Sequence, residues 1–354
     1  MLVTEIKQQR RDENKYNVFV DGEFAFSLLM QDILYFKIKE NEEIPEEKYN
    51  YIINEVVYIK AQDKALNFLS SKMRTEKEMR TKLKSLDYSE EVIERVNPGI
   101  IGINVCFGEE SYIGGVEIDD KTFYEKMKVS KELPKTSSPS PDRFIEAYKC
   151  EEDEILVFTL TSKLSGTHSN AVLAKTMYLE EHPEKRIEVI DTQSGSIGVA
   201  LMMLKCNELI EQGKTMDEIL NEIEKYKKDI IFFGALDTLE NAIKGGRVNP
   251  LAGKVMNALN LKVIIRIDEG LVKPIDKARG GVNSIKKALD YVKSHVNDEK
   301  EKTIIIAHAN CPEKAHKIKS IIEEDSNFKE VLIASIGPIM GTFTAEGAIL
   351  VAVL

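Results

Sequence analysis

The segment 154–171 reads EILVFTLTSKLSGTHSNA, an apolar run followed by a loop with six hydroxyl side chains and one glycine. The apolar run is typical of a buried strand, and NAVLAKTMYLEEH (170–182) has the spacing of an amphipathic helix. The segment therefore predicts a strand that passes directly into a helix, which is the repeating unit of an α/β fold.

The same alternation continues from residue 98 to the C-terminus. Strand-like apolar runs stand at 99–107, 186–191, 230–236, 261–267, 303–309, 331–337 and 348–354. Helical patterns stand between several of them, at 198–213, 215–228, 284–296 and 312–325. Apolar strands that alternate with helices predict an α/β fold with mostly parallel sheets.

Residues 1–97 have a different pattern and predict a separate small domain. KYNVFVDGEFAFSL (15–28) places Asp21-Gly22 between two strands, which favours a type I′ hairpin. Three helical stretches follow, the second with a capping box at Thr75 and Glu78 and the third with Ser89 as N-cap. The prediction is a hairpin followed by a three-helix unit.

Composition excludes several functional classes. A chain of 354 residues is long enough for two or more domains, and its net charge of −10 disfavours direct binding to nucleic acid or acidic membranes. We expect neither a signal peptide nor a membrane span. The four cysteines lie far apart and away from zinc-like spacing, so we expect a reducing, cytoplasmic setting without metal or cofactor.

Three hydroxyl-rich loops follow predicted strands, in LPKTSSPSP (133–141), in the loop 159–169 and in DTQSGSIG (191–198). Ligands of α/β folds settle at the carboxyl ends of strands, where helix N-termini favour anions. Hydroxyl groups add donors without charge, although each loop alone is also explained by helix capping. Together the three loops predict a shared anion pocket.

The sequence supports a catalytic site less strongly than it supports an anion pocket. Ser165 is not in a G-x-S-x-G motif, and a hydrolase that pairs Ser165 with His168 remains a minor alternative. His308 is a further possible base with no acidic partner that the sequence can place. GGRVNPLAGK (245–254) lacks the spacing of a phosphate-binding P-loop. Because none of these catalytic motifs is complete, we expect no enzyme activity.

Residues 1–96 resemble the start of RecX, the bacterial modulator of the RecA recombinase. The resemblance rests on KYNVFVDGEFAFSL and on KAQDKALNFLSSKMRTEKEMRTKLKSLDYSEEVIERV (60–96), and it covers only the first three-helix repeat of that family. It implies that RecA is an alternative partner, through residues 1–97.

Residues 98–354 resemble the DegV family. The resemblance rests on FGEESYIGGVEID (107–119), LPKTSSPSP, LTSKLSGT (160–167), VIDTQSGSIG (189–198), AIKGGRV (242–248) and AHANCPEKA (307–315). It implies two α/β lobes that hold a long-chain fatty acid, which the protein carries to a fatty-acid kinase without catalysing a reaction. By this resemblance, Thr136 and Ser165, with the helix-end amides at Gly166, hold the carboxylate, and Arg247 and Arg279 contact the kinase.

Two features of the sequence depart from the DegV pattern, a missing segment and one substituted residue. The family's first strand and its D-S-T/S-x-D-L motif are missing, so we expect an uncovered sheet edge. The histidine that the family often has near the C-terminus is Phe343 here, with Thr342 or Thr344 as a weak substitute.

Overall fold

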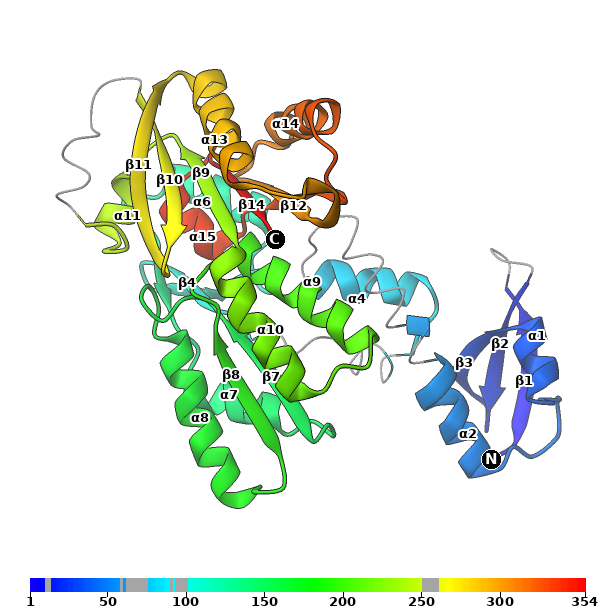
Figure 1. Cartoon of the computed structure of the whole chain (residues 1–354). Helices are drawn as coiled ribbons and strands as arrows, with labels where there is room; N and C mark the ends of the chain where they lie inside the picture. Colours follow the sequence, from blue (N-terminus) through cyan, green and yellow to red (C-terminus); the bar gives the residue numbers. More distant parts are fainter. Residues whose placement is uncertain (10–13, 58–59, 62–75, 90–91, 93–100, 250–260) are drawn as a thin grey trace. The chain divides into compact units, whose positions relative to one another are not determined.

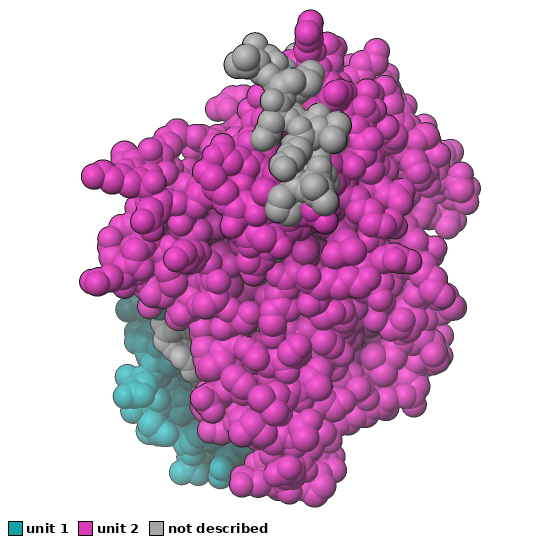
Figure 2. Space-filling view, turned by 90° about the vertical axis from the view of Figure 1, so that its left-hand side faces the viewer, with its two compact units in different colours: residues 1–100 teal, residues 101–354 magenta. Residues whose placement is uncertain are grey.

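The computed structural model describes the chain except for residues 10–13, 58–59, 62–75, 90–91, 93–100 and 250–260. Contacts divide the chain into two compact units, residues 1–100 and residues 101–354, which Figure 2 colours separately.

The first unit begins with an antiparallel sheet of three strands, β1 (Val3–Gln8), β2 (Lys15–Val20) and β3 (Glu23–Leu29). Asp21 and Gly22 join β2 to β3 with φ values of 51° and 88°, so the predicted hairpin with two positive φ angles is confirmed. β1 adds a third strand to this hairpin.

Helical segments follow this sheet. They are α1 (Met30–Tyr35), α2 (Glu46–Tyr51), the π-helix η1 (Ile52–Val57) and α4 (Glu76–Ser85). Ser89 Oγ accepts a hydrogen bond from Val92 N at 3.4 Å, as expected of the predicted N-cap. The predicted capping box at Thr75 lies outside the described residues, as does most of the predicted helix 87–96.

The second unit is built on a six-stranded sheet with the order β11-β10-β9-β14-β12-β13. The strands are β9 (Ile231–Leu236), β10 (Leu261–Asp268), β11 (Leu271–Arg279), β12 (Thr303–His308), β13 (Glu330–Ser335) and β14 (Ile349–Val353). β12 and β13 pair in parallel, whereas the other four pairs of this sheet are antiparallel.

The prediction of mostly parallel sheets is therefore wrong for this sheet. The physical reason is clearest at β10 and β11, which are joined by the two residues Glu269 and Gly270, with φ values of 47° and 78°. A two-residue turn of this kind can only return the chain antiparallel. Apolar runs indicate burial on both faces but carry no information on strand direction.

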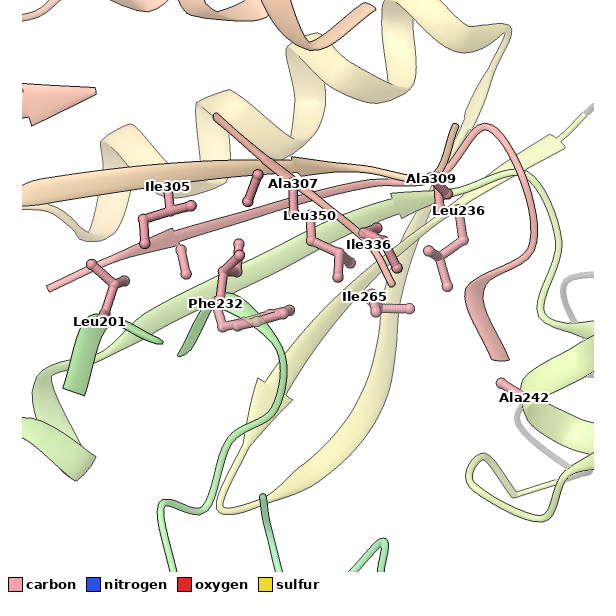
Figure 3. Close-up of a cluster of buried hydrophobic side chains, with 14 of the residues drawn as sticks. Leu201, Phe232, Leu236, Ala242, Ile265, Ile305, Ala307, Ala309, Ile336 and Leu350 are labelled. Carbon is pink, nitrogen blue, oxygen red and sulfur yellow. The ribbon is translucent and has the colours of Figure 1, made fainter. Parts of the chain in front are cut away.

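Side chains of the sheet alternate between two buried faces. Ile304 and Ile306 of β12 pack toward α13 (Gly281–His295) and α14 (Pro312–Asp325), which cover one face in Figure 1. Ile305 and Ala307 point to the opposite face, in the cluster of Figure 3. Helices on this second face include α6 (Asp120–Val129), α9 (Ile197–Glu211) and α15 (Pro338–Thr344).

Two smaller sheets complete the second unit. One is antiparallel, with β4 (Asn104–Phe107), β5 (Glu110–Ile113) and β6 (Lys135–Ser137), and the other is a parallel pair of β7 (Glu154–Thr159) and β8 (Arg186–Asp191). The remaining helices are α7 (Pro141–Tyr148), α8 (Thr167–Glu181), α10 (Met216–Asp229), α11 (Glu240–Lys244) and the short η2 (Glu299–Glu301).

The parallel pair is less covered than the large sheet. Ile155, Leu156, Val157 and Phe158 of β7 are only half-buried, whereas all six residues of β12 are buried. Among the described strands, β7 pairs with β8 alone. One edge of β7 is therefore unpaired within the described strands.

Within the part of the chain that is described, every helix is too short or too polar to span a membrane.

Candidate functional site

The second unit encloses a cavity between the six-stranded sheet and the loops of the smaller sheets. Its volume is about 80 Å³, several times the roughly 10–15 Å³ that one buried water needs. The lining is mostly apolar: Ile103, Leu160, Leu164, Phe232, Leu236, Ala242, Ile265, Ile267, Val272, Ile339, Met340, Phe343 and Leu350. The described lining residues with polar side chains are Thr136, Ser138, Ser165, Arg247 and Thr344.

The apolar wall belongs to the main hydrophobic core. Phe232 and Leu236 of β9, Ile265 of β10 and Leu350 of β14 extend from the same face of the sheet, with Ala242 of α11 beside them (Figure 3). The wall is rigid because these side chains stand on paired neighbouring strands. Such an apolar wall is chemically suited to an alkyl chain.

The hydroxyl side chains of Thr136, Ser138 and Ser165 come from two segments that meet, the end of β6 and the loop between β7 and α8. Thr136 lies on β6, opposite Val105 of β4, and Ser138 follows it. Ser138 Oγ lies 3.4 Å from Ser165 Oγ, in the loop between β7 and α8. A side chain at Gly166 would stand 3.3 Å from Ser138 Oγ, so glycine permits this approach of the loops.

The hydroxyl group of Ser165 lies between those of Ser138 and Thr167, and the three form a hydroxyl cluster. Ser165 Oγ lies 2.9 Å from Thr167 Oγ1 and accepts a hydrogen bond from Thr167 N at 3.3 Å. Thr167 is the first residue of α8, whose first turn contains no acidic side chain. The helix end therefore adds partial positive charge beside the hydroxyl groups.

Arg247 also lies at this polar cluster. Its Nε donates to Leu164 O at 3.1 Å, and its Nη1 donates to Gly245 O at 2.6 Å. Its Cζ lies 5.0 Å from the ring centroid of Phe343. The sequence suggested Arg247 only as a kinase contact, whereas the half-buried side chain lines the cavity. Arg279, the other suggested contact, is exposed at the end of β11 and does not line it.

The threonines near Phe343 are weak substitutes for a histidine. Thr342 Oγ1 donates to Pro338 O at 2.9 Å, and Thr344 Oγ1 donates to Met340 O at 3.1 Å. Both hydroxyl protons are therefore committed to the backbone of α15. Phe343 itself presents an apolar ring to the cavity.

The third hydroxyl-rich loop does not line the cavity, contrary to the expectation of one shared pocket. Thr192 and Ser194 are fully buried, and Thr192 Oγ1 donates to Thr159 O at 2.8 Å. Ser194 Oγ has no hydrogen-bond partner among the described residues. The hydrogen bond of the Thr192 side chain holds the loop against β7.

The hydrogen bonds of this region do not support His168 or His308 as a catalytic base. Nδ1 of His168 lies 3.1 Å from Thr159 Oγ1, while Ser165 bonds to Ser138 and Thr167. His308 is buried at the end of β12, and its Nδ1 lies 3.4 Å from Cys311 N. Ser165 and His168 are thus hydrogen-bonded to other residues and not to each other.

Asp191 links the loop after β7 to the loop after β8. Its Oδ1 accepts hydrogen bonds from Ser162 N at 3.2 Å and from Gln193 N at 3.0 Å. Burial opposes ionisation, but the Ser162 hydroxyl, these N–H groups and the charge of His168 outweigh it. The pKa of Asp191 is therefore lowered.

The described residues contain no group of three or more side chains arranged to hold a metal ion. The four cysteines are free thiols, and burial raises the pKa of Cys206 to about 11.

Sequence reasoning missed Ile339 and Met340 as lining residues because it did not identify α15. The available signal was Pro338, a favoured first residue of a helix, after Gly337.

Comparison with protein families identifies both parts of the chain. Residues 84–354 match the family described as "Uncharacterised protein, DegV family". Residues 1–45 match the RecX N-terminal domain, and residues 61–96 match the first three-helix domain of RecX. Both resemblances inferred from the sequence are confirmed, and the two matches overlap at residues 84–96.

Individual relatives agree with this result. A DegV domain-containing protein of Streptococcus gordonii is 30% identical over 253 residues, which are 71% of this chain and 88% of the relative. A DegV family structure from Ruminococcus gnavus, described with vaccenic acid, has 29% identity and a TM-score of 0.68 over 75% of this chain and 95% of that one. The Fatty Acid Kinase (Fak) B3 protein of Streptococcus pneumoniae, loaded with linoleic acid, has 28% identity and a TM-score of 0.66 over 71% and 89%.

Proposed function

Since this chain belongs to the DegV family over residues 84–354, we propose that it binds a long-chain fatty acid in the cavity and presents the carboxyl group to a fatty-acid kinase. Thr136, Ser165 and the amide groups at Gly166 hold the carboxylate. The protein acts as a carrier in the cytoplasm and catalyses nothing itself.

The observation that carries this proposal is the composition of the cavity wall. A continuous apolar wall meets a compact cluster of hydroxyl groups and one guanidinium group. An amphiphile with one polar end fits such a lining, whereas a sugar or nucleotide would leave polar groups against the apolar wall. The fatty acids in the related structures, vaccenic and linoleic acid, are amphiphiles of this kind.

Simple energetics are consistent with the proposal. A buried CH₂ group contributes about 0.8 kcal/mol, so a chain of roughly 16 carbons brings on the order of 10 kcal/mol. Association and the desolvation of the carboxylate cost several kcal/mol each. Binding is therefore favourable only if the polar cluster hydrogen-bonds the carboxylate.

Arg279 and Arg247 are the proposed contacts with the kinase. Arg279 is exposed and accessible to a partner from solvent, whereas the half-buried Arg247 would be reached only beside the bound carboxylate. The Fak B3 relative supports a kinase as the partner class, since its name assigns it to a fatty-acid kinase.

The experiment begins with organic extraction and mass spectrometry of the purified full chain, followed by fatty-acid titration of delipidated protein. We expect a co-purifying fatty acid and a loss of affinity of about tenfold or more in Ser165→Ala, because a hydrogen bond to a charged group is removed. Ser169→Ala, an exposed serine on the first turn of α8, is the matched control and should bind like the wild type. Absence of lipid and of binding would contradict the proposal.

A second candidate function is favoured by the RecX matches at residues 1–45 and 61–96. We propose that the first unit contacts RecA. Addition of the full chain to a RecA strand-exchange reaction would test this, and an unchanged rate at saturating protein would remove RecA as a partner.

A further inference from the structure

The polar cluster of the cavity contains a charge that hydroxyl groups alone do not supply. Arg247 is the only charged side chain among the described residues that line the cavity. Its permanent positive charge distinguishes an ionised head group from a neutral one, whereas hydroxyl groups can bond to either. The orientation of this guanidinium group therefore decides which lipids the cavity accepts.

The guanidinium group is held from three directions. Leu164 O accepts from Nε and Gly245 O accepts from Nη1, while the ring of Phe343 lies 5.0 Å from Cζ. These carbonyl bonds account for two of the five N–H donors of an arginine. The remaining donors stay available to a carboxylate oxygen beside Ser165, the residue next to Leu164.

Phe343 is packed so closely that its ring has little freedom. A Cβ atom on Gly245 would stand 2.6 Å from Cε1 of Phe343, so the ring lies directly on the backbone of this glycine. The carbonyl of the same glycine accepts the hydrogen bond from Arg247. Ring, glycine and arginine thus form one packed unit, contributed by α15 and by the end of α11.

We propose that Phe343 is a positioning residue that holds Arg247 at the head of the cavity, and that this pair makes the site select an ionised acyl carboxylate over an uncharged lipid head. The inference rests on the proposed function and deepens it. The aromatic face attracts the cation without competing for its N–H donors.

The test compares dodecanoic acid with dodecan-1-ol, which have the same number of carbon atoms and differ in head-group charge. Dissociation constants for both are measured on delipidated full chain, with unfolding temperatures as the folding control. We expect the wild type to prefer the acid by about tenfold or more, and Arg247→Met to lose most of that preference.

Variants of Phe343 separate positioning from packing. Phe343→Leu should reduce the acid-to-alcohol preference by about three- to tenfold while the affinity for the alcohol changes less than twofold. Phe343→Tyr keeps the aromatic face and should retain the preference. If Phe343→Leu does not fold, Arg247→Lys replaces it, because lysine keeps the charge but loses the planar group that stacks on the ring.

Two results would overturn the inference while leaving fatty-acid binding intact. One is an acid-to-alcohol preference that does not change in Arg247→Met. The other is an equal weakening of both ligands in Phe343→Leu, which would make the ring a packing residue only. A wild type that binds neither ligand would overturn the proposed function as well.

Discussion

Two loops of similar composition leave the neighbouring strands β7 and β8, and only the first opens into the cavity. The loop at 160–166 places Ser165 in the cavity wall, whereas the loop at 192–196 buries Thr192 and Ser194 away from it. Both are rich in hydroxyl groups, contain glycine and lead into a long helix, α8 or α9.

The difference lies in the partners of the hydroxyl groups. Ser165 shares hydrogen bonds with the hydroxyl groups of Ser138 and Thr167, whose protons can rotate toward a ligand. Thr192 donates to the carbonyl of Thr159, which is fixed in β7. A hydroxyl group bonded to backbone stabilises the loop, and one bonded to other hydroxyl groups remains available for binding.

The two loops are nevertheless joined by common contacts. Asp191 bonds to the backbone of both loops. The turn of the β10–β11 hairpin reaches both as well, since a Cβ atom on Gly270 would stand 2.3 Å from Thr161 Oγ1 and 3.5 Å from Gln193 Cα. The comparison can therefore be tested at the shared contacts and within each loop.

The largest effect on the free energy of unfolding is expected from Gly270→Ala. This position has φ of 78°, which disfavours a side chain, and the new methyl group would collide with Thr161. We expect a loss of roughly 2–4 kcal/mol in the free energy of unfolding. Chemical denaturation measures it, and Gly213→Ala is the control, since Gly213 also has positive φ, 72°, but open space around it. Equal losses in both variants would show that the contact with the loops contributes nothing.

An intermediate effect is expected from a matched pair of threonines. Thr192→Val removes a buried hydrogen bond and should lower the free energy of unfolding by about 1–3 kcal/mol, with fatty-acid affinity unchanged. Thr136→Val should lower the affinity and leave the stability within about 0.5 kcal/mol. Unfolding and titration curves of both variants test this, and the reverse pattern would assign binding to Thr192 and stability to Thr136.

The smallest expected effect is on the pH dependence of stability. The folded pKa of Asp191 is lowered, so its stabilisation is fully present above its unfolded pKa of about 3.9 and is lost as the pH falls through the folded value. Asp191→Asn should unfold at a lower temperature than the wild type at pH 7, by less than about 3 °C because solvent screens this partly exposed group.

The gap between Asp191→Asn and the wild type should narrow as the pH falls below the unfolded pKa of about 3.9 and close once the pH is below the lowered, folded pKa. Asp290→Asn, at an exposed position of α13, is the control and should follow the wild type at both pH values. A gap that persists at low pH would assign the effect to packing and not to the charge of Asp191.

Local chemistry was predictable where adjacent residues determine it. Asp21-Gly22 indicated the first hairpin, and at the predicted helix 215–228 the neighbouring residues Thr215 and Glu218 form both hydrogen bonds of a capping box. β11 was missed because Pro274 and alternating charges hide it, and the structure places Pro274 beside a register shift, where a missing N–H is tolerated.

The candidate site was predictable in its residues more than in their orientation. Thr136 and Ser165 line the cavity, but whether Arg247 points inward depends not only on the nearby Gly245 but also on Leu164 and Phe343, which are distant in sequence. Side-chain direction set by such contacts leaves no local pattern to recognise.

The position of β14 has a consequence for how the protein is made. This strand is the last of the large sheet along the chain, yet it lies between β9 and β12. During synthesis on the ribosome, β9–β11 and β12–β13 emerge first and remain separate halves, each with an apolar border, until β14 joins them. The first unit has its own core, whereas the large sheet of the second unit is complete only once β14 has been synthesised.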